Sequence, residues 1–223
     1  MNSLVKTFGS INIIEDYISK DTCDFLINIY NDSFTETPNK GILGGPSQGL
    51  DYAWTVGPGS PFPPYSANKN KNIASDLITN ITNSMGRSIS NFYSESVDLR
   101  TIFLSKMITG AKLQEHYDNY EPGGKEFYAH GTDAETIDKI GFESDWSALL
   151  YLNDEYQGGE IEFPQYDLKL KPKPGTFVFF KGDMDALHFV NEVTGGNRIN
   201  LITFYWRTEY RKQYFEALAS KSI

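Results

Sequence analysis

Residues 175–206 read GTFVFFKGDMDALHFVNEVTGGNRINLITFYW. Three short apolar or alternating runs, GTFVFF, DALHFV and RINLITFYW, are separated by residues that favour turns, with VTGGN before the last run. Runs of this length, rich in β-branched and aromatic residues, are typical of strands. The segment therefore predicts three successive strands, a turn at VTGGN and a fold in which strands dominate.

The same pattern begins upstream, after residue 97. Four further runs precede the quoted segment: LRTIFLSKMI (99–108), DWSALLYLN (145–153), EIEFP (160–164) and DLKLKP (167–172). Residues 120–145, rich in Gly, Glu and Asp, are predicted to be one long loop. Because strand follows strand without a helical pattern between them, we expect a sandwich or jelly-roll barrel rather than a parallel sheet.

Helical patterns lie towards both ends of the chain. Residues 18–32 are predicted to form a helix capped by Ser19, and residues 70–93 a second one. The second helix repeats apolar residues at nearly four-residue spacing: Ile73, Leu77, Ile81, Met85, Ile89 and Phe92. Between the helices, residues 41–70 are a predicted loop with one short strand at DYAWTV (51–56). A last helix is predicted over residues 208–221.

Composition limits the classes of function. The chain has 223 residues and a formal net charge of −9, with its basic residues scattered, which argues against a nucleic-acid partner. Its single cysteine, Cys23, excludes an intrachain disulfide and a thiolate metal cluster, and we expect a buried helical thiol. The N-terminus lacks a signal-peptide pattern and no apolar run reaches membrane-spanning length, so we expect a soluble, cytoplasmic protein without a membrane partner.

A candidate metal site begins at QEHYDNY, residues 114–120. In an extended segment residues two apart point to the same side, so His116 and Asp118 can reach one ion. A third ligand is available from His188 in the run DALHFV, 72 residues after His116. Two histidines and one carboxylate on one side of an ion are typical of non-haem Fe(II) oxygenases. The remaining histidine, His130, receives no role.

Arg198 strengthens this interpretation. It lies ten residues after His188, at the start of the run RINLITFYW. An arginine inside a barrel needs an anion, and its planar guanidinium suits a carboxylate. A dicarboxylic acid could therefore bind the metal at one end and Arg198 at the other. A salt bridge to an Asp or Glu of the chain remains an alternative.

These segments together resemble the iron(II) and 2-oxoglutarate-dependent dioxygenases, and within them the prolyl 4-hydroxylase-like group. The resemblance covers about residues 97–206, through TGAKLQEHYDNY, SALLYLNDEYQGGEIEFP and LKPKPGTFVFFKGDMDALHFVNEVTGGNRINLITFYW. It implies a mainly β fold with flanking α-helices, a double-stranded β-helix or jelly roll. One oxygenase domain is expected over residues 1–223, with mainly helical support and loops in 1–96, the core in 97–206 and a helix in 207–223.

The resemblance also implies a site and a reaction. His116, Asp118 and His188 would hold Fe(II), and Arg198 would bind the far carboxylate of 2-oxoglutarate. Tyr151 matches a position where related hydroxylases help to hold that carboxylate, although a core tyrosine is an equal alternative. The implied reaction uses O2, converts 2-oxoglutarate to succinate and carbon dioxide and hydroxylates a C–H bond, with ascorbate as the candidate reductant.

The resemblance implies a prolyl residue in a peptide or protein as the substrate, as for procollagen-proline 4-dioxygenase, with residues 41–70 and 120–145 as lids. Arg198 stands where collagen-type enzymes usually carry lysine, Leu113 where they commonly have tyrosine, and Phe204 where tryptophan is frequent. A hydroxylase of a free amino acid or another small molecule therefore remains open. A non-catalytic jelly-roll module with a structural zinc ion is the rival from another class.

Overall fold

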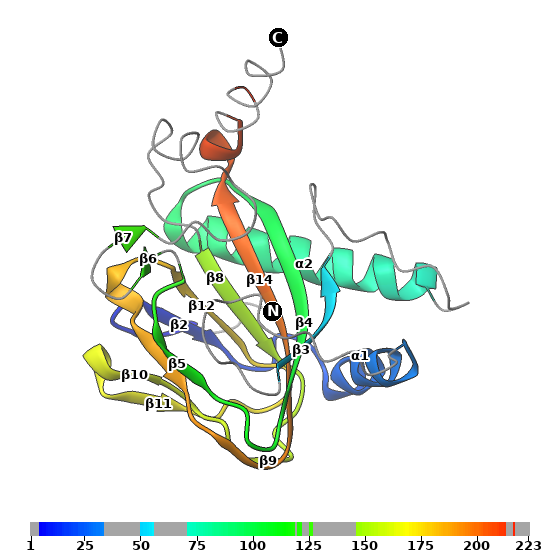
Figure 1. Ribbon diagram of the computed structural model, residues 1–223. Helices are drawn as coiled ribbons and strands as arrows, with labels where there is room; N and C mark the ends of the chain where they lie inside the picture. The colour runs from blue at the N-terminus through cyan, green and yellow to red at the C-terminus, as the bar shows by residue number, and fades with distance from the viewer. Residues whose placement is uncertain are drawn as a thin grey trace.

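The computed structural model describes residues 5–33, 50–55, 71–118, 120–121, 125–126, 146–212 and 216. Two antiparallel sheets face each other, and helices cover the outer side of the larger one (Figure 1). This arrangement confirms the expected mainly β fold with flanking helices. The limits given above for a single domain stay a prediction.

The larger sheet has the strand order β1-β2-β12-β8-β14-β4-β3, with β9 paired to β14. Its central pairs are long: β14 pairs with β4 from Asn197↔Ile108 to Arg207↔Val97, and with β8 from Asn200↔Tyr151 to Tyr205↔Trp146. The strands are β1 (Val5–Phe8), β2 (Ile11–Ile14), β3 (Leu50–Thr55), β4 (Val97–Ile108), β8 (Trp146–Tyr151), β9 (Tyr156–Gly158), β12 (Phe177–Lys181) and β14 (Val193–Arg207).

The smaller sheet has the order β11-β10-β13-β5 and lies opposite the larger one. Its strands are β5 (Leu113–His116), β10 (Ile161–Phe163), β11 (Leu168–Leu170) and β13 (His188–Val190). A separate pair, β6 (Tyr120–Glu121) with β7 (Lys125–Glu126), lies within the segment predicted to be one long loop. That prediction was wrong for these residues, and most of the segment 120–145 lies outside the described residues.

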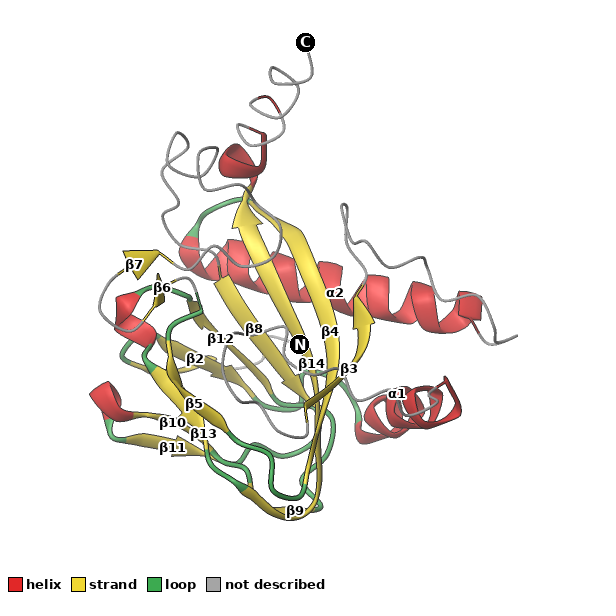
Figure 2. Cartoon of the chain, in the orientation of Figure 1, coloured by secondary structure: helices red, strands yellow, loops and turns green. Residues whose placement is uncertain are grey.

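Two helices pack on the outer face of the larger sheet, as Figure 2 shows for α1 (Lys20–Ser33) and α2 (Lys71–Tyr93). Both were predicted, and the Ser19 cap is confirmed because its Oγ accepts a hydrogen bond from the Thr22 amide at 3.2 Å. Phe92 departs from the prediction, since it is 43% exposed. Of the predicted C-terminal helix, residues 208–212 and 216 are helical and the others lie outside the described residues.

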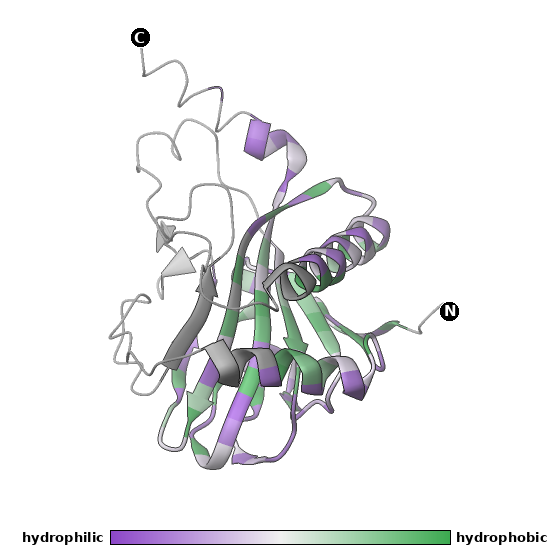
Figure 3. Ribbon diagram, turned by 90° about the vertical axis from the view of Figure 1, so that its right-hand side faces the viewer, coloured by the Kyte–Doolittle hydropathy of each residue, from purple (hydrophilic) through white to green (hydrophobic). Residues whose placement is uncertain are grey.

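Alternation along the strands separates two apolar clusters, because successive side chains point to opposite faces. In β8, Ala148 and Leu150 join Met85 and Ile89 of α2 in the cluster under the helices. Figure 3 shows the hydrophobic strand residues behind these helices. Leu149 and Tyr151 instead join a second cluster between the two sheets. The space between the sheets is therefore where inward-facing polar residues meet.

Several strands were not predicted, and one turn was predicted wrongly. The hairpin β1–β2 and the short strand β9 carry weak signals, whereas β3 falls where the short strand at 51–56 was expected. Residues 193–197, VTGGN, belong to β14 instead of forming a turn. They pair with β9, with a register shift between Val193 and Gly195. Glycines suit this stretch because Gly196 has φ +74° and a Cβ there would lie 2.6 Å from the Glu155 carbonyl oxygen.

Among the described residues, no helix combines the length and the apolar character needed to cross a bilayer.

We expect Gly175→Ala to lower the free energy of unfolding by about 2–4 kcal/mol. Gly175 has φ +82°, and an added Cβ would lie 2.2 Å from the Ile18 carbonyl oxygen. Its amide donates to the Tyr151 carbonyl and its own carbonyl accepts from the Tyr17 amide, both at 2.8 Å. The substitution would therefore strain the junction between the N-terminal segment, β8 and β12.

Urea unfolding of Gly175→Ala beside Gly110→Ala would test this. Gly110 also has a positive φ, +89°, but no described atom lies within 4 Å of a Cβ built there. The control should therefore lose only about 1 kcal/mol, the cost of the backbone conformation alone. Equal losses in the two variants would show that the close approach at Gly175 has no energetic weight.

Candidate metal centre and anion site

The two histidines of the predicted metal site lie opposite each other on neighbouring strands. His116 ends β5, His188 begins β13, and the two are direct partners in the antiparallel pairing of these strands. Their ring centroids are 4.4 Å apart. The pairing of β5 with β13 thus brings together two residues that are 72 positions apart in the chain.

Asp118 completes the group two residues after β5 ends. Its Oδ1 lies 3.6 Å from His116 Nε2 and 3.9 Å from His188 Nε2. One ligand atom from each of the three residues lies within 4.8 Å of the others. Imidazole and carboxylate ligands sit about 2 Å from a bound metal ion, so one ion can contact all three residues.

Backbone carbonyl groups orient both imidazole rings. His116 Nδ1 donates to the Gln114 carbonyl at 2.7 Å, and His188 Nδ1 donates to the Ala186 carbonyl at 2.8 Å. In neutral imidazole, a proton on Nδ1 leaves Nε2 with a free lone pair. Both Nε2 atoms face Asp118, so the donor set fits a divalent metal ion.

The ionisation of His188 and Asp118 matches what metal binding requires. Burial lowers the pKa of His188 to about 4. Burial acts to raise the pKa of Asp118, but the nearby His188 and His116 outweigh it and lower that pKa to about 2. For His116, burial acts downward, and the hydrogen bond and charge of Asp118 raise its pKa overall. At neutral pH the buried histidine is thus neutral and the carboxylate is ionised.

Arg198 lies inside the barrel, 2% exposed, on β14. Its Nη2 donates to the Tyr151 hydroxyl at 3.1 Å, and its Nη1 lies 3.3 Å from the Met107 sulfur. With the Asn200 amide oriented so that its oxygen faces the guanidinium, that oxygen accepts from Nη1 and Nη2 at 3.1 Å each. These neighbours are neutral, so they orient the guanidinium without compensating its charge.

The salt bridge considered as an alternative is absent from the described part of the chain. No ion pair among these residues includes Arg198, and its Nε has no hydrogen-bond partner there. A buried cation without a counter-ion is costly to the fold. The arrangement therefore favours a bound anion, and a carboxylate suits the free guanidinium edge.

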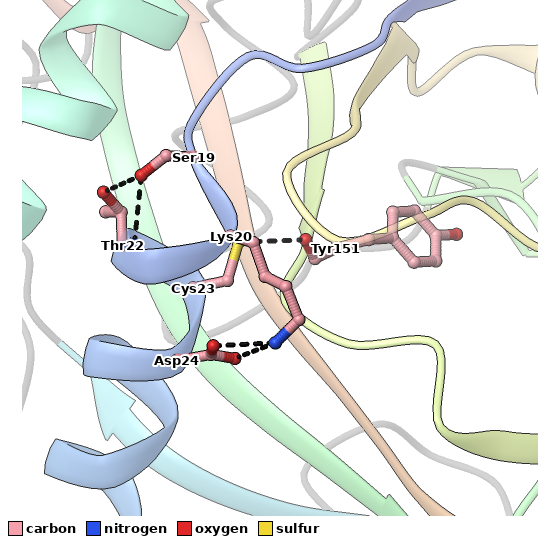
Figure 4. A network of polar contacts seen from close by, with 6 residues as sticks. All are labelled: Ser19, Lys20, Thr22, Cys23, Asp24 and Tyr151. Atoms are coloured by element: carbon pink, nitrogen blue, oxygen red, sulfur yellow. Dashed lines mark hydrogen bonds and ion pairs between the residues drawn. The ribbon is translucent and has the colours of Figure 1, made fainter.

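Contacts of both its backbone and its ring hold Tyr151 in position. Its carbonyl lies 3.9 Å from the Cys23 sulfur, while its amide donates to the Thr176 carbonyl at 2.9 Å. Figure 4 shows its ring pointing away from α1, and the Arg198 guanidinium lies 5.1 Å from the centre of this ring. Cys23 is the buried helical thiol expected from the sequence, and burial raises its pKa to about 11.

Other polar residues of the site were not predicted from the sequence. These are Ser105 on β4 and Asn200 on β14, which are register partners of each other. Asn200 is also the register partner of the predicted Tyr151 on β8, so the three side chains share one face. Asn200 lies two residues after Arg198, a spacing that could have indicated the shared face, whereas the cross-strand register could not be read from the sequence. His130 and most of the two expected lids lie outside the described residues.

Comparisons with known proteins agree with this fold. A model of the 2OG-Fe(II) oxygenase superfamily matches residues 102–206. Human prolyl 3-hydroxylase 3 is 36% identical over 75 residues, which cover 31% of this chain and 10% of that protein. Rat prolyl 3-hydroxylase 2 is 42% identical over 59 residues, or 24% of this chain and 8% of that protein. The chain thus aligns with only a small part of these curated relatives.

Solved structures share the fold along most of the chain. The viral collagen prolyl hydroxylase of Paramecium Bursaria Chlorella virus-1 in its 2OG complex has a TM-score of 0.57 at 20% identity, covering 88% of this chain and 94% of that one. A Pseudomonas putida prolyl-4-hydroxylase has a TM-score of 0.58 at 16% identity, covering 89% and 93%. At these identities the likeness concerns the fold, and it confirms the expected jelly roll.

Proposed function

We propose that this chain, whose residues 102–206 belong to the 2OG-Fe(II) oxygenase superfamily, is an Fe(II)- and 2-oxoglutarate-dependent dioxygenase that hydroxylates prolyl residues in a peptide or protein. The observation that carries the proposal is a His–Asp–His group in the same barrel as a buried arginine without a carboxylate partner among the described residues. The His–Asp–His group suits a metal ion, and the buried arginine suits the far carboxylate of a dicarboxylic acid.

Each residue has a distinct part in this proposal. His116, Asp118 and His188 would hold Fe(II), and Arg198 with Tyr151 would bind the far carboxylate of 2-oxoglutarate. Bound iron would let dioxygen convert 2-oxoglutarate to succinate and carbon dioxide while the second oxygen atom enters a C–H bond of the substrate.

The surroundings of His188 are apolar. Phe163 and Phe180 have ring centroids 5.5 and 5.1 Å from that of His188. These rings keep water away from one side of the group, which lowers the local dielectric and strengthens electrostatic contacts inside the site.

The choice of a prolyl substrate rests on the relatives. The curated matches include prolyl 3-hydroxylases, and the structural neighbours include a Pseudomonas putida prolyl-4-hydroxylase and a Trichoplax adhaerens prolyl hydroxylase in complex with a hypoxia inducible factor peptide fragment. We propose hydroxylation at the 4-position, the position implied by the sequence resemblance. The matched 3-hydroxylases make the 3-position the alternative to be measured.

We expect proline-containing peptides to stimulate succinate production from 2-oxoglutarate with Fe(II), O2 and ascorbate, and to gain one oxygen atom. Peptides with alanine at each proline are the matched control, and hydrolysis would separate 3- from 4-hydroxyproline. Stimulation by free amino acids alone would reassign the substrate class. Tight zinc binding without turnover would favour the non-catalytic module.

A further inference from the structure

Tyr156 carries a buried hydroxyl whose role the fold does not explain. The residue begins β9 and is 3% exposed. Its hydroxyl makes no well-aligned hydrogen bond among the described residues, although it lies close enough to the Arg198 side chain to interact with it. A buried hydroxyl without a partner costs stability, so such a group calls for a ligand or another function.

The strand pairing directs Tyr156 towards Arg198. Tyr156 is the register partner of Gly196 on β14, two residues before Arg198. Residues two apart on a strand share a face, and Gly196 has no side chain to separate the two. Burial raises the pKa of Tyr156 to about 12, and the nearby Arg198 acts in the opposite direction. Tyr156 also belongs to the apolar cluster that contains Tyr151 and Met107, both neighbours of Arg198.

The hydrogen bonds around Arg198 leave three donors free. Its Nη atoms contact Tyr151, Asn200 and Met107, whereas its Nε has no partner in the described chain. The Tyr151 oxygen accepts from Arg198, so the Tyr151 proton remains available. The Tyr156 proton is the third. A carboxylate accepts about four hydrogen bonds, so one group can bind all three donors.

We propose that the Tyr156 hydroxyl donates to the same ligand carboxylate as Arg198 and Tyr151, and that it helps to select a dicarboxylic over a monocarboxylic 2-oxo acid. This inference rests on the proposed function, because 2-oxoglutarate is the dicarboxylic acid concerned. A site with two phenol donors beside one guanidinium discriminates against an acid that leaves these donors unpaired.

The test measures binding of 2-oxoglutarate and 2-oxobutyrate to the iron-loaded protein without oxygen, by isothermal titration calorimetry. 2-Oxobutyrate keeps the chelating end and lacks the far carboxylate. We expect Tyr156→Phe to weaken 2-oxoglutarate binding about tenfold and to leave 2-oxobutyrate binding unchanged. The thermal stability of the ligand-free variant should be equal or higher, because the substitution removes a hydroxyl without a partner.

Tyr205→Phe is the matched control. The Tyr205 hydroxyl donates to the Thr82 carbonyl at 2.7 Å in the cluster under the helices. This variant should lose stability and keep the affinity for 2-oxoglutarate. Unchanged 2-oxoglutarate binding in Tyr156→Phe, with normal binding by the wild type, would overturn this inference alone. Absence of 2-oxoglutarate binding by the iron-loaded wild type would overturn the proposed function and this inference with it.

Discussion

Replacing His188 with alanine is expected to lower succinate production from 2-oxoglutarate by more than about 100-fold. Residues that only support a metal ligand typically contribute about 10- to 100-fold to affinity or activity, so a ligand itself should contribute more. His188 is buried, and its Nε2 faces Asp118 at 3.9 Å. Alanine offers no atom that could replace this nitrogen.

The measurement combines turnover with iron content after anaerobic reconstitution. His130→Ala is the matched control, because it replaces the one histidine outside the group and the sequence assigns it no role. We expect the control to retain iron and activity. The melting temperature of both metal-free variants shows whether they fold. A folded His188→Ala protein with more than a tenth of wild-type turnover would contradict the assignment of His188 as a ligand.

The parts of the fold predicted from sequence are those whose pattern is local. β8, β12 and β14 read as apolar or alternating runs because their central residues are covered on both faces, by the helices and by the smaller sheet. β1 gave no such signal, since Lys6 and Thr7 are exposed at the sheet edge. The turn predicted at VTGGN was wrong for a related reason. Its glycines allow a close approach to β9, and this approach depends on strand pairing that the sequence does not show.

The residues of the candidate site also differ in whether a local sequence pattern could predict them. His116 and Asp118 are close in sequence, so their shared side follows from local geometry. The pairing of His188 with His116 depends on the register of β13 against β5, and nothing in the 71 intervening residues encodes that register locally. Tyr156 was missed for this reason, since its relation to Arg198 passes through the pairing of β9 with Gly196 on β14. Asn200 lies on the same strand as Arg198, two residues further on, so its spacing was available in the sequence.

Arg198→Met is expected to raise the KM for 2-oxoglutarate by at least about 100-fold while the ligand-free protein stays as stable or gains about 1–3 kcal/mol. The guanidinium is buried among Tyr151, Asn200 and Met107, without a carboxylate among the described residues. Removing an uncompensated buried charge stabilises the ligand-free fold. Methionine is a flexible, unbranched side chain that suits an apolar pocket. Removing the same charge deprives the ligand carboxylate of its cationic hydrogen-bond donor.

Unfolding free energies in urea and steady-state kinetics would be measured on Arg198→Met and on Arg198→Lys. Lysine keeps the charge but not the planar fork, so we expect an intermediate loss of about tenfold in KM. If Arg198→Met raised the free energy of unfolding and also raised the KM for 2-oxoglutarate, Arg198 would be a residue that serves the ligand and lowers the stability of the fold. If the methionine variant instead lost stability and kept its affinity, Arg198 would be a structural residue, and the carboxylate site would have to lie elsewhere in the barrel.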